Sequence, residues 1–303
     1  MTVPDDVRAN VLRFFGEDGR AWMARLPDVV AALAERWGLT LGTPYGGGSH
    51  ALVLDVTRTD GMPAVLKVPA QDDENAGEAA ALTCYRGDGA ALLYDSDPAT
   101  GALLLERLEP GTPLRDHPDS EEAIDIACAL LRRLRRPVPA GHPFPLVRDL
   151  LRRWAEELTA VEARHPEALD WAERDEFASA LRELAIQEGA EMLVNRDANT
   201  GNVLAAQREP WLLIDPKPLV GEAAFDGGWL LVDLLRPAPG RAAAQRLAGH
   251  IGARLGVPAD RVRAWAFVRA AQTAYWELGS GGDPSVYRSL AAALSARQSA
   301  PAP

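Results

Sequence analysis

Cysteine is scarce in this sequence of 303 residues, where it occurs only as Cys84 and Cys128. Two thiols cannot provide a disulfide framework, and they are too few for a structural zinc site. The five histidines are scattered along the chain without the spacing of metal ligands. Both cysteines lie in segments with helical periodicity, so we expect them to be buried and to pack as small hydrophobic groups.

Basic residues are also few, with 32 lysines and arginines against 43 acidic residues and a net charge of −11. This balance argues against a nucleic-acid partner, because nucleic-acid phosphates need a basic protein face. A negative cleft would concentrate a cationic small-molecule substrate, so the charge is compatible with one. An acidic surface also simply keeps proteins soluble, and the net charge alone does not distinguish the two.

Long hydrophobic runs are missing, and no segment approaches the ~20 apolar residues that span a bilayer. The first ten residues carry Asp5, Asp6 and Arg8 in place of the apolar core of a signal peptide. We therefore expect a cytoplasmic protein with no membrane partner. Hydrophobic residues make up 47% of the chain and charged residues 25%, which is typical of a globular protein with room for two lobes.

The apolar pattern predicts a first lobe, residues 1–108, with a helical lead-in followed by an antiparallel sheet. Two helices are expected, at 7–15 and 26–37, on either side of a Gly-Glu-Asp-Gly break. One further helix is inserted after the third strand of the sheet. The expected strands are 41–44, 51–57, 64–68, 90–94 and 102–108, and the inserted helix is 73–86.

Residues 109–303 are predicted to form a second, mainly helical lobe after a hinge near 106–111, which gives an α+β fold class with two lobes. One β-hairpin interrupts the helices, with strands at 202–206 and 211–215. Acidic residues begin the first helix and arginines end it, which suits the helix dipole. The expected helices are 121–136, 147–164, 172–187, 242–255, 258–278 and 284–297.

A glycine triplet in the first lobe is a candidate phosphate-binding loop. Gly46, Gly47, Gly48 and the following Ser49 lie between two expected strands. Without Cβ atoms, the backbone N–H groups of such a loop can approach phosphate oxygens closely. A glycine-rich hairpin turn has the same composition, so this feature alone does not establish nucleotide binding.

A lysine inside an apolar strand is the second candidate in this lobe. Lys67 stands within residues 64–68, and an ammonium group buried there without a partner would be destabilising. Glu78, eleven residues further along on the inserted helix, can return across the sheet to pair with it. Such a pair would aim Lys67 at nucleotide phosphates, as in phosphoryl-transfer enzymes. The alternative is a lysine that faces solvent on an edge strand.

Three polar residues of the second lobe carry the strongest functional signal. Asp197 is followed by Asn202 after five residues and by Asp215, at the end of an apolar strand, after eighteen. An amide and a carboxylate brought together by a loop and a hairpin can hold a hard cation through oxygen. A further carboxylate without a metal can accept a hydrogen bond from a substrate hydroxyl. Each residue alone is common in loops, but the set predicts catalysis by Asp197 and metal binding by Asn202 and Asp215.

These motifs resemble those of the aminoglycoside (streptomycin-type) and hydroxyurea antibiotic phosphotransferase family, which has a protein-kinase-like fold. Residues 197–202 match the Asp-x-x-x-x-Asn catalytic loop of that fold, and residues 210–221 resemble the metal-binding segment of the family. Residues 101–112 resemble its hinge, and 261–278 its C-terminal helix. The likeness runs from about 38 to 279, and its second motif is fairly specific to the family.

The resemblance implies an ATP-dependent kinase that uses Mg²⁺ and inactivates a small cationic antibiotic. It implies a place for Glu106 of the hinge at the nucleotide. It also implies that acidic residues of the helical lobe, with Asp226 and Glu277 as candidates, meet ammonium or guanidinium groups of the substrate. The tryptophans at helical positions are expected to lie in the core. The acceptor molecule and the oligomeric state do not follow from the sequence.

The catalytic loop departs from the family pattern. The family usually has histidine and glycine before the aspartate and a histidine two residues after it, where this chain has Asn195, Arg196 and Asn199. Asparagine can imitate only part of the hydrogen bonding of the first histidine. A pseudokinase that binds nucleotide or ligand without transfer is therefore an alternative. A glycosidase with paired carboxylates is a third, and it leaves Lys67 and the glycine triplet unexplained.

Overall fold

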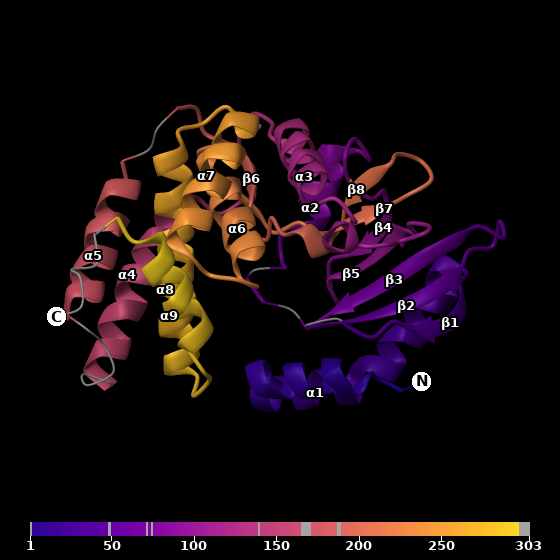
Figure 1. Cartoon of the computed structure of the whole chain (residues 1–303). Coiled ribbons are helices and arrows are strands. Elements are labelled where there is room, and N and C mark those ends of the chain that lie inside the picture. Colours follow the sequence, from indigo (N-terminus) through magenta and orange to yellow (C-terminus); the bar gives the residue numbers. More distant parts are fainter. Residues whose placement is uncertain are drawn as a thin grey trace. The chain divides into compact units, whose positions relative to one another are not determined.

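The structure of the chain is a computed structural model that describes residues 2–47, 50–70, 72–73, 75–138, 140–164, 171–186 and 189–296. The chain divides into two compact units. The first contains Met1–Thr112 and Leu204–Lys217, and the second contains Pro113–Val203 and Pro218–Pro303. Figure 1 labels the helices and most of the strands of both units.

The first unit is built on a five-stranded antiparallel sheet with the order β1-β2-β3-β5-β4. One face of the sheet packs against helix α1, and buried side chains such as Val11 and Val30 of the helix meet Leu52 and Leu66 of the sheet. A short helix, α2, follows the third strand, as expected. The elements are α1 Asp5–Trp37, β1 Thr40–Pro44, β2 Ala51–Thr57, β3 Pro63–Pro69, α2 Glu78–Tyr85, β4 Leu93–Asp97 and β5 Ala102–Glu106.

Three boundaries in this unit differ from the expectation. The expected break between the two N-terminal helices is present as a kink inside α1 at Gly16, where φ is 51° and ψ is −117°, but the second helical stretch begins well before the expected residue 26. The inserted helix begins only at Glu78. The expected strand at 90–94 is displaced to Leu93–Asp97, because Ala90 and Ala91 pair instead with Leu213 far along the chain.

The hairpin of β7 (Val203–Ala205) and β8 (Trp211–Leu213) was expected in the second lobe, yet residues 204–217 belong to the first unit. The reason is its backbone hydrogen bonding. The N–H of Ala205 donates to the carbonyl of Thr112 at 2.9 Å, and the N–H of Leu213 donates to the carbonyl of Gly89 at 3.0 Å. The hairpin therefore belongs to the unit that contains the five-stranded sheet, and so does the segment that follows β8.

The second unit is mainly helical, with α8 at its centre in contact with α4, α5, α6, α7 and α9. Two features of this unit were not expected from the sequence. One is the short antiparallel pair of strands β6 and β9, and the other is helix α6. The elements are α3 Ser120–Leu134, α4 Val147–Arg164, α5 Trp171–Leu184, β6 Met192–Asn195, β9 Pro218–Gly221, α6 Ala224–Leu235, α7 Arg241–Leu255, α8 Ala259–Gly279 and α9 Ser285–Leu294, with single 3₁₀ turns at Leu114–Asp116 and Thr200–Asn202.

The two cysteines lie on helices and are unbridged, as expected. Cys128 on α3 is buried, and its burial raises the pKa of the thiol to about 12. Cys84 on α2 is only partly buried, so it is more exposed than predicted. Among the described residues, no helix combines the length and the apolar character that crossing a membrane requires.

Helices α6 and α8 approach closely because α6 carries glycine at the contact. A Cβ atom on Gly228 would lie 2.5 Å from the Cβ of Trp265 on α8. We predict that Gly228→Ala lowers the free energy of unfolding by about 1–3 kcal/mol, because the two backbones must separate. Chemical denaturation measures this change.

The same substitution at Gly249, an exposed position inside α7 with no atom near its added Cβ, is the matched control. Gly249→Ala should leave stability unchanged or raise it by up to about 1 kcal/mol, because alanine is the better helix former. Equal effects of the two substitutions would show that the α6–α8 contact tolerates a side chain.

Candidate active site

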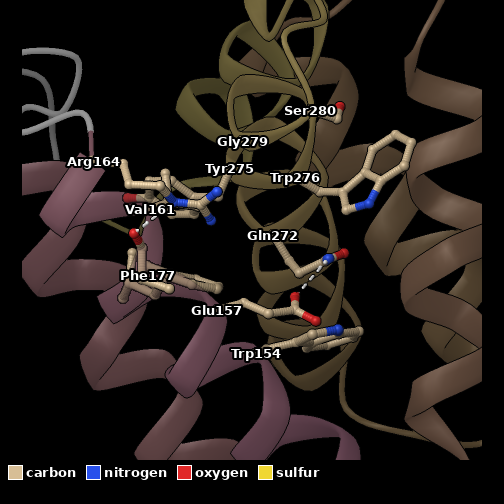
Figure 2. A pocket seen from close by; sticks show the side chains of 12 residues that line it. Trp154, Glu157, Val161, Arg164, Phe177, Gln272, Tyr275, Trp276, Gly279 and Ser280 are labelled. Carbon is tan, nitrogen blue, oxygen red and sulfur yellow. Dashed lines mark hydrogen bonds between the residues drawn. The ribbon is translucent and has the colours of Figure 1, made fainter. Parts of the chain in front are cut away.

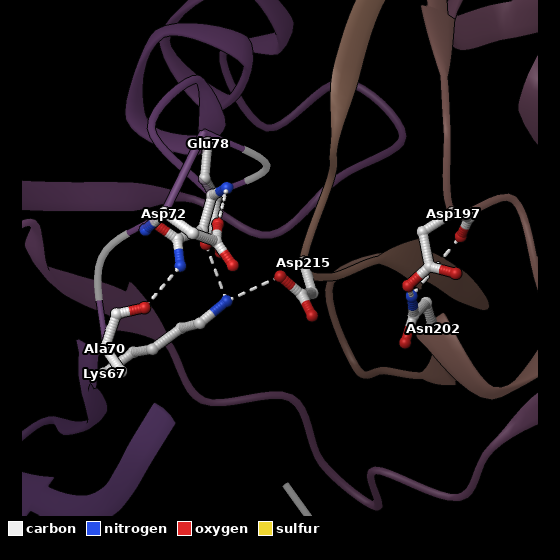
Figure 3. Close-up of polar contacts among 8 residues, drawn as sticks. Lys67, Ala70, Asp72, Glu78, Asp197, Asn202 and Asp215 are labelled. Carbon is white, nitrogen blue, oxygen red and sulfur yellow. Dashed lines mark hydrogen bonds and ion pairs between the residues drawn. The ribbon is translucent and has the colours of Figure 1, made fainter. Parts of the chain in front are cut away.

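Lys67 lies on the central strand β3, where its ammonium group contacts two carboxylates (Figure 3). The Nζ atom is 2.6 Å from Oε2 of Glu78 and 2.7 Å from Oδ1 of Asp215. Lys67 is 8% exposed and Glu78 is 2% exposed, so this cluster is buried apart from Asp215. The pair with Glu78 follows the sequence expectation, and the contact with Asp215 adds a second partner. All three residues belong to the first unit.

The charges of this cluster do not balance, because one ammonium group faces two carboxylates. Burial alone would lower the pKa of Lys67, but the charges of Asp215 and Glu78 outweigh burial and raise it above its ordinary value. Burial raises the pKa of Glu78, against the attraction of Lys67. The lysine therefore stays charged at neutral pH, and the surplus negative charge lies where Asp215 meets solvent.

Asp215, two residues after the end of β8 and directly before Pro216, has an unusual backbone with φ at 50°. This left-handed region is uncommon for residues other than glycine, although aspartate tolerates it better than most. Such strain is of order 1–3 kcal/mol and persists only where surrounding contacts hold it. The attached hairpin and the ion pair with Lys67 hold it here, and the side chain remains 29% exposed. A carboxylate held in this way can bind a hard cation.

Two of the four expected phosphate-loop residues are described. Gly47 has φ at 80°, a conformation that favours glycine. Its N–H group donates a hydrogen bond to the carboxylate of Asp6, and this bond lowers the pKa of Asp6. An anionic oxygen thus already occupies the backbone donor that was expected to meet a phosphate. Gly46 precedes it in a bend, and the expectations for Gly48 and Ser49 lie outside the described residues.

Glu106, which was expected at the nucleotide, uses its side chain elsewhere. Arg208 of the β7–β8 hairpin binds it in a fork, with two N–O distances of 2.9 Å. The N–H of Leu92 donates to the same carboxylate at 2.9 Å. These contacts fasten the hairpin to the end of β5. The place of Glu106 at a nucleotide stays a prediction.

In the second unit, Asp197 follows β6, and three side-chain N–H groups fix its carboxylate. Oδ1 accepts hydrogen bonds from Nδ2 of Asn199 and from Nε1 of Trp229, each at 2.9 Å. Oδ2 accepts one from Nδ2 of Asn202, also at 2.9 Å, as Figure 3 shows. Charged acceptors make stronger hydrogen bonds than neutral ones, so this arrangement holds the carboxylate in one orientation.

The two asparagines that replace histidines brace this loop. Asn195 is buried, and its Oδ1 accepts a hydrogen bond from the N–H of Asp197 at 3.1 Å. Asn199 uses its Oδ1 to accept from the N–H groups of Gly201 and Asn202, at 2.8 and 3.1 Å, and so caps the 3₁₀ turn. Both asparagines therefore make side-chain hydrogen bonds that hold the loop.

Asp226, expected at the substrate, has a different role. It is 1% exposed, its Oδ1 accepts from the N–H of Asn195 at 2.7 Å, and its Oδ2 lies 3.0 Å from Nε of Arg135. Burial raises the pKa of Asp226, although Arg135 and the Asn195 hydrogen bond oppose the shift. The structure therefore assigns Asp226 to bracing the catalytic loop. Glu277 is half-buried near the end of α8, and its substrate contact stays a prediction.

Trp229 contacts the candidate catalytic carboxylate, and this contact was not expected from the sequence. The residue was expected to be a core side chain, yet its indole N–H binds Asp197 and its ring lies 3.9 Å from the guanidinium carbon of Arg269. The helical pattern could not show this, because the hydrogen bond depends on how α6 is rotated. Asn202 and Asp215 belong to different units, so their sharing of one metal ion also stays a prediction.

A family model described as aminoglycoside/hydroxyurea antibiotic resistance kinase matches residues 36–281 of the chain. A streptomycin 6-kinase of Streptomyces glaucescens is 36% identical over 303 aligned residues, covering 96% of each chain. A hydroxyurea phosphotransferase of Kitasatospora aureofaciens is 37% identical, over 92% of this chain and 81% of the relative. The solved structure of a choline kinase from Streptococcus pneumoniae matches the fold with a TM-score of 0.66, over 89% of this chain and 99% of that chain, at 12% identity.

The buried pair of Arg135 and Asp226 can be tested by stability. We predict that Arg135→Met lowers the free energy of unfolding by about 3–5 kcal/mol at pH 8, because Asp226 then stays buried without its counter-charge. The folded-state pKa of Asp226 is raised above its unfolded value, so the loss should shrink as pH falls and Asp226 is protonated.

The control is Arg132→Met on the exposed face of the same helix, which should change stability by about 0.5 kcal/mol or less at either pH. Denaturant titrations of the wild type and both variants at pH 5 and pH 8 give the change in the free energy of unfolding for each variant at each pH. If Arg135→Met lowered the free energy of unfolding as little as the control does, the burial of Asp226 would not depend on this ion pair.

Proposed function

The chain belongs to the aminoglycoside/hydroxyurea antibiotic resistance kinase family, and we propose that it transfers the γ-phosphate of ATP to a hydroxyl of a streptomycin-type antibiotic. The acceptor would be a small cationic molecule that phosphorylation inactivates. The carboxylate of Asp197, held by three side-chain N–H groups, is the observation that carries this proposal. A kinase needs such a carboxylate at the acceptor hydroxyl, oriented and without a metal of its own.

Asp197 would act mainly by orientation. Its carboxylate accepts a hydrogen bond from the acceptor hydroxyl, whose oxygen forms a bond to the γ-phosphorus of ATP. The bond between that phosphorus and the bridging β–γ oxygen breaks, and ADP leaves with the electron pair. The hydroxyl proton passes to Asp197 late in the reaction and then to solvent. The products are ADP, the phosphorylated acceptor and one proton.

Lys67 would bind the phosphates of ATP that are not transferred. Its ammonium group is positioned by Glu78, and the two atoms are 2.6 Å apart. Because Lys67 remains charged, it can neutralise part of the phosphate charge. Gly47 would add its backbone N–H, which binds the carboxylate of Asp6 in this structure.

Magnesium fits the first unit at Asp215. Mg²⁺ prefers oxygen ligands and takes only one or two carboxylates from a protein when phosphates supply the rest. Asp215 is 29% exposed and carries the surplus negative charge of the lysine cluster, so its chemistry suits the ion. Asn202 would contribute its carbonyl oxygen, because its Nδ2 donates to Asp197. When bound, the ion supplies charge neutralisation at the phosphates.

A pseudokinase is not favoured. It was suggested by the replaced histidines, but Asn195 and Asn199 form hydrogen bonds that hold the loop around Asp197. A glycosidase is not favoured either, because the relatives with named activities are kinases and phosphotransferases.

The first test of this function is Asp197→Ala. We expect ATP affinity to be unchanged within about threefold and transfer to fall at least about a hundredfold, since positioning and proton acceptance are both lost. ADP release in the presence of streptomycin measures transfer, and a binding titration measures ATP affinity. Asp260→Ala is the control, because that side chain is 93% exposed at the start of α8. Turnover of Asp197→Ala at the level of the control would remove Asp197 from the mechanism.

The second test concerns Asp215. We predict that Mg²⁺ tightens ATP binding by the wild type, and that Asp215→Asn loses at least about tenfold of this effect because the anionic metal ligand is gone. Titrations of ATP with Mg²⁺ and with a chelator give the two affinities. Asp60→Asn, in an exposed turn, should behave as the wild type does. The same magnesium dependence in Asp215→Asn would place the metal elsewhere.

A further inference from the structure

Arg115 packs on the loop that holds Asp197. It is the middle residue of the 3₁₀ turn Leu114–Asp116, which Leu114 anchors in the core with 0% exposure. A Cβ atom added to Gly201 would lie 1.9 Å from Nη2 of Arg115, 2.5 Å from its Cζ and 2.9 Å from its Nε. The guanidinium group therefore lies against the backbone of Gly201, in contact with the catalytic loop.

Gly201 makes room for this group. Its φ lies outside the left-handed region, so the backbone conformation alone does not require glycine. Its N–H donates to Oδ1 of Asn199 at 2.8 Å, and the residue is buried in the 3₁₀ turn Thr200–Asn202. A side chain at this position would have to displace the guanidinium group, because Cβ contacts below 3.0 Å essentially do not occur. The missing Cβ atom thus allows the close approach of Arg115.

This contact lies beside the reacting end of the site. Gly201 lies between Asn199 and Asn202 in the sequence. Nδ2 of each asparagine donates to the carboxylate of Asp197 at 2.9 Å, and Figure 3 shows the bond from Asn202. In the proposed reaction the γ-phosphoryl group must meet the acceptor hydroxyl at Asp197. It therefore comes to the loop on which Arg115 lies.

Arg115 is available to bind an anion. The residue is exposed, and within the described ranges its guanidinium group has no hydrogen-bond or ion-pair partner. Other arginines of this unit are engaged, as Arg135 is by Asp226 and Arg261 is by Glu222. A guanidinium group without a paired carboxylate suits an anionic ligand such as a phosphate.

The cavity of about 270 Å³ between α4, α5 and α8, shown in Figure 2, does not suit a phosphate. Arg164 lines it, but the Nε of this arginine donates to the carbonyl of Ala160 on the same helix. The carboxylate of Glu157 also lines the cavity and would repel a phosphate. Arg115 on the catalytic loop is therefore the better-placed cation for the transferred group.

We propose that Arg115 is a catalytic residue that binds the γ-phosphate of ATP and stays with it as it moves to the acceptor. Its planar fork of N–H donors can bind two phosphate oxygens at once. It neutralises charge on these oxygens in the transition state and exchanges no proton, because arginine stays protonated. Lys67 would remain with the phosphates that are not transferred. The proposal deepens the proposed function and rests on it for the identity of the anion.

Two nucleotides distinguish the γ-phosphate from the other phosphates. Titration calorimetry of the full chain with Mg²⁺ measures the binding of ADP and of the non-hydrolysable β,γ-imido analogue of ATP. Arg115→Gln removes the charge of the side chain. Arg246→Gln on α7 is the matched control, because it removes the same charge at an exposed position of the same unit.

We expect Arg115→Gln to raise the Kd for the ATP analogue about tenfold and to leave the Kd for ADP within about twofold. The kcat for streptomycin phosphorylation should fall about a hundredfold, with KM for streptomycin within about twofold, because the contact strengthens in the transition state. Arg115→Lys should lie between the wild type and Arg115→Gln, since it keeps the charge and loses the fork. Arg246→Gln should change each value less than about twofold.

Gly201→Ala tests how the guanidinium group is held. In the wild-type background the added Cβ should displace this group and raise the Kd for the ATP analogue about fivefold. In the Arg115→Gln background the same substitution should have less than about a twofold effect, because the displaced group is already absent. Equal effects in the two backgrounds would contradict the proposal.

Equal weakening of the ATP analogue and of ADP by Arg115→Gln, or no weakening of either, would overturn the proposal. Failure of this contact is distinguishable from failure of the proposed function. Unchanged binding and unchanged transfer in Arg115→Gln would remove Arg115 and leave the kinase. Preferential loss of the ATP analogue in Arg115→Gln, in a chain that phosphorylates neither streptomycin nor hydroxyurea, would support the γ-phosphate contact and remove the antibiotic kinase.

Discussion

Three side-chain hydrogen bonds hold the carboxylate of Asp197 in one orientation. Asn199 and Asn202 supply two of the donors from the loop itself, and Trp229 supplies the third from α6. The loop geometry therefore depends on where α6 lies. The buried ion pair of Asp226 with Arg135 ties this helix to α3, and glycines on α6 let it pack directly against α8. Packing far from the reacting atoms thus sets the direction of one carboxylate.

The lysine cluster of the first unit is also held by hydrogen bonds to a charged group, but there the charged group is a cation between two carboxylates. Asp197 is surrounded by donors, whereas Lys67 is shared between Glu78 and Asp215, which leaves surplus negative charge. Such a cluster suits Mg²⁺, because the cation would offset the negative charge, and the ion together with Lys67 could then receive the phosphates of ATP. The left-handed backbone of Asp215 indicates that this residue is held for a purpose other than stability.

Some of this could be predicted from the sequence because it follows from local rules. A lysine inside an apolar strand requires a partner, and Glu78 was the available one; the spacing from Asp197 to Asn202 identified the loop. Contacts between distant segments could not be predicted. The fork of Arg208 on Glu106 joins residues 102 positions apart, and no local pattern encodes it. Asp226 was expected to contact the substrate for the same reason. The sequence of a helix does not show that one of its acidic residues is buried and paired with a distant arginine.

We propose that a loop with asparagines in place of histidines positions Asp197 for phosphoryl transfer. Phosphorus-31 NMR of the wild-type chain with ATP, Mg²⁺ and streptomycin tests this proposal. We expect a new phosphomonoester resonance that grows in step with ADP, because the γ-phosphate moves to a hydroxyl oxygen of the acceptor. Growth of inorganic phosphate alone, or ATP that stays intact while it is bound, would contradict this proposal.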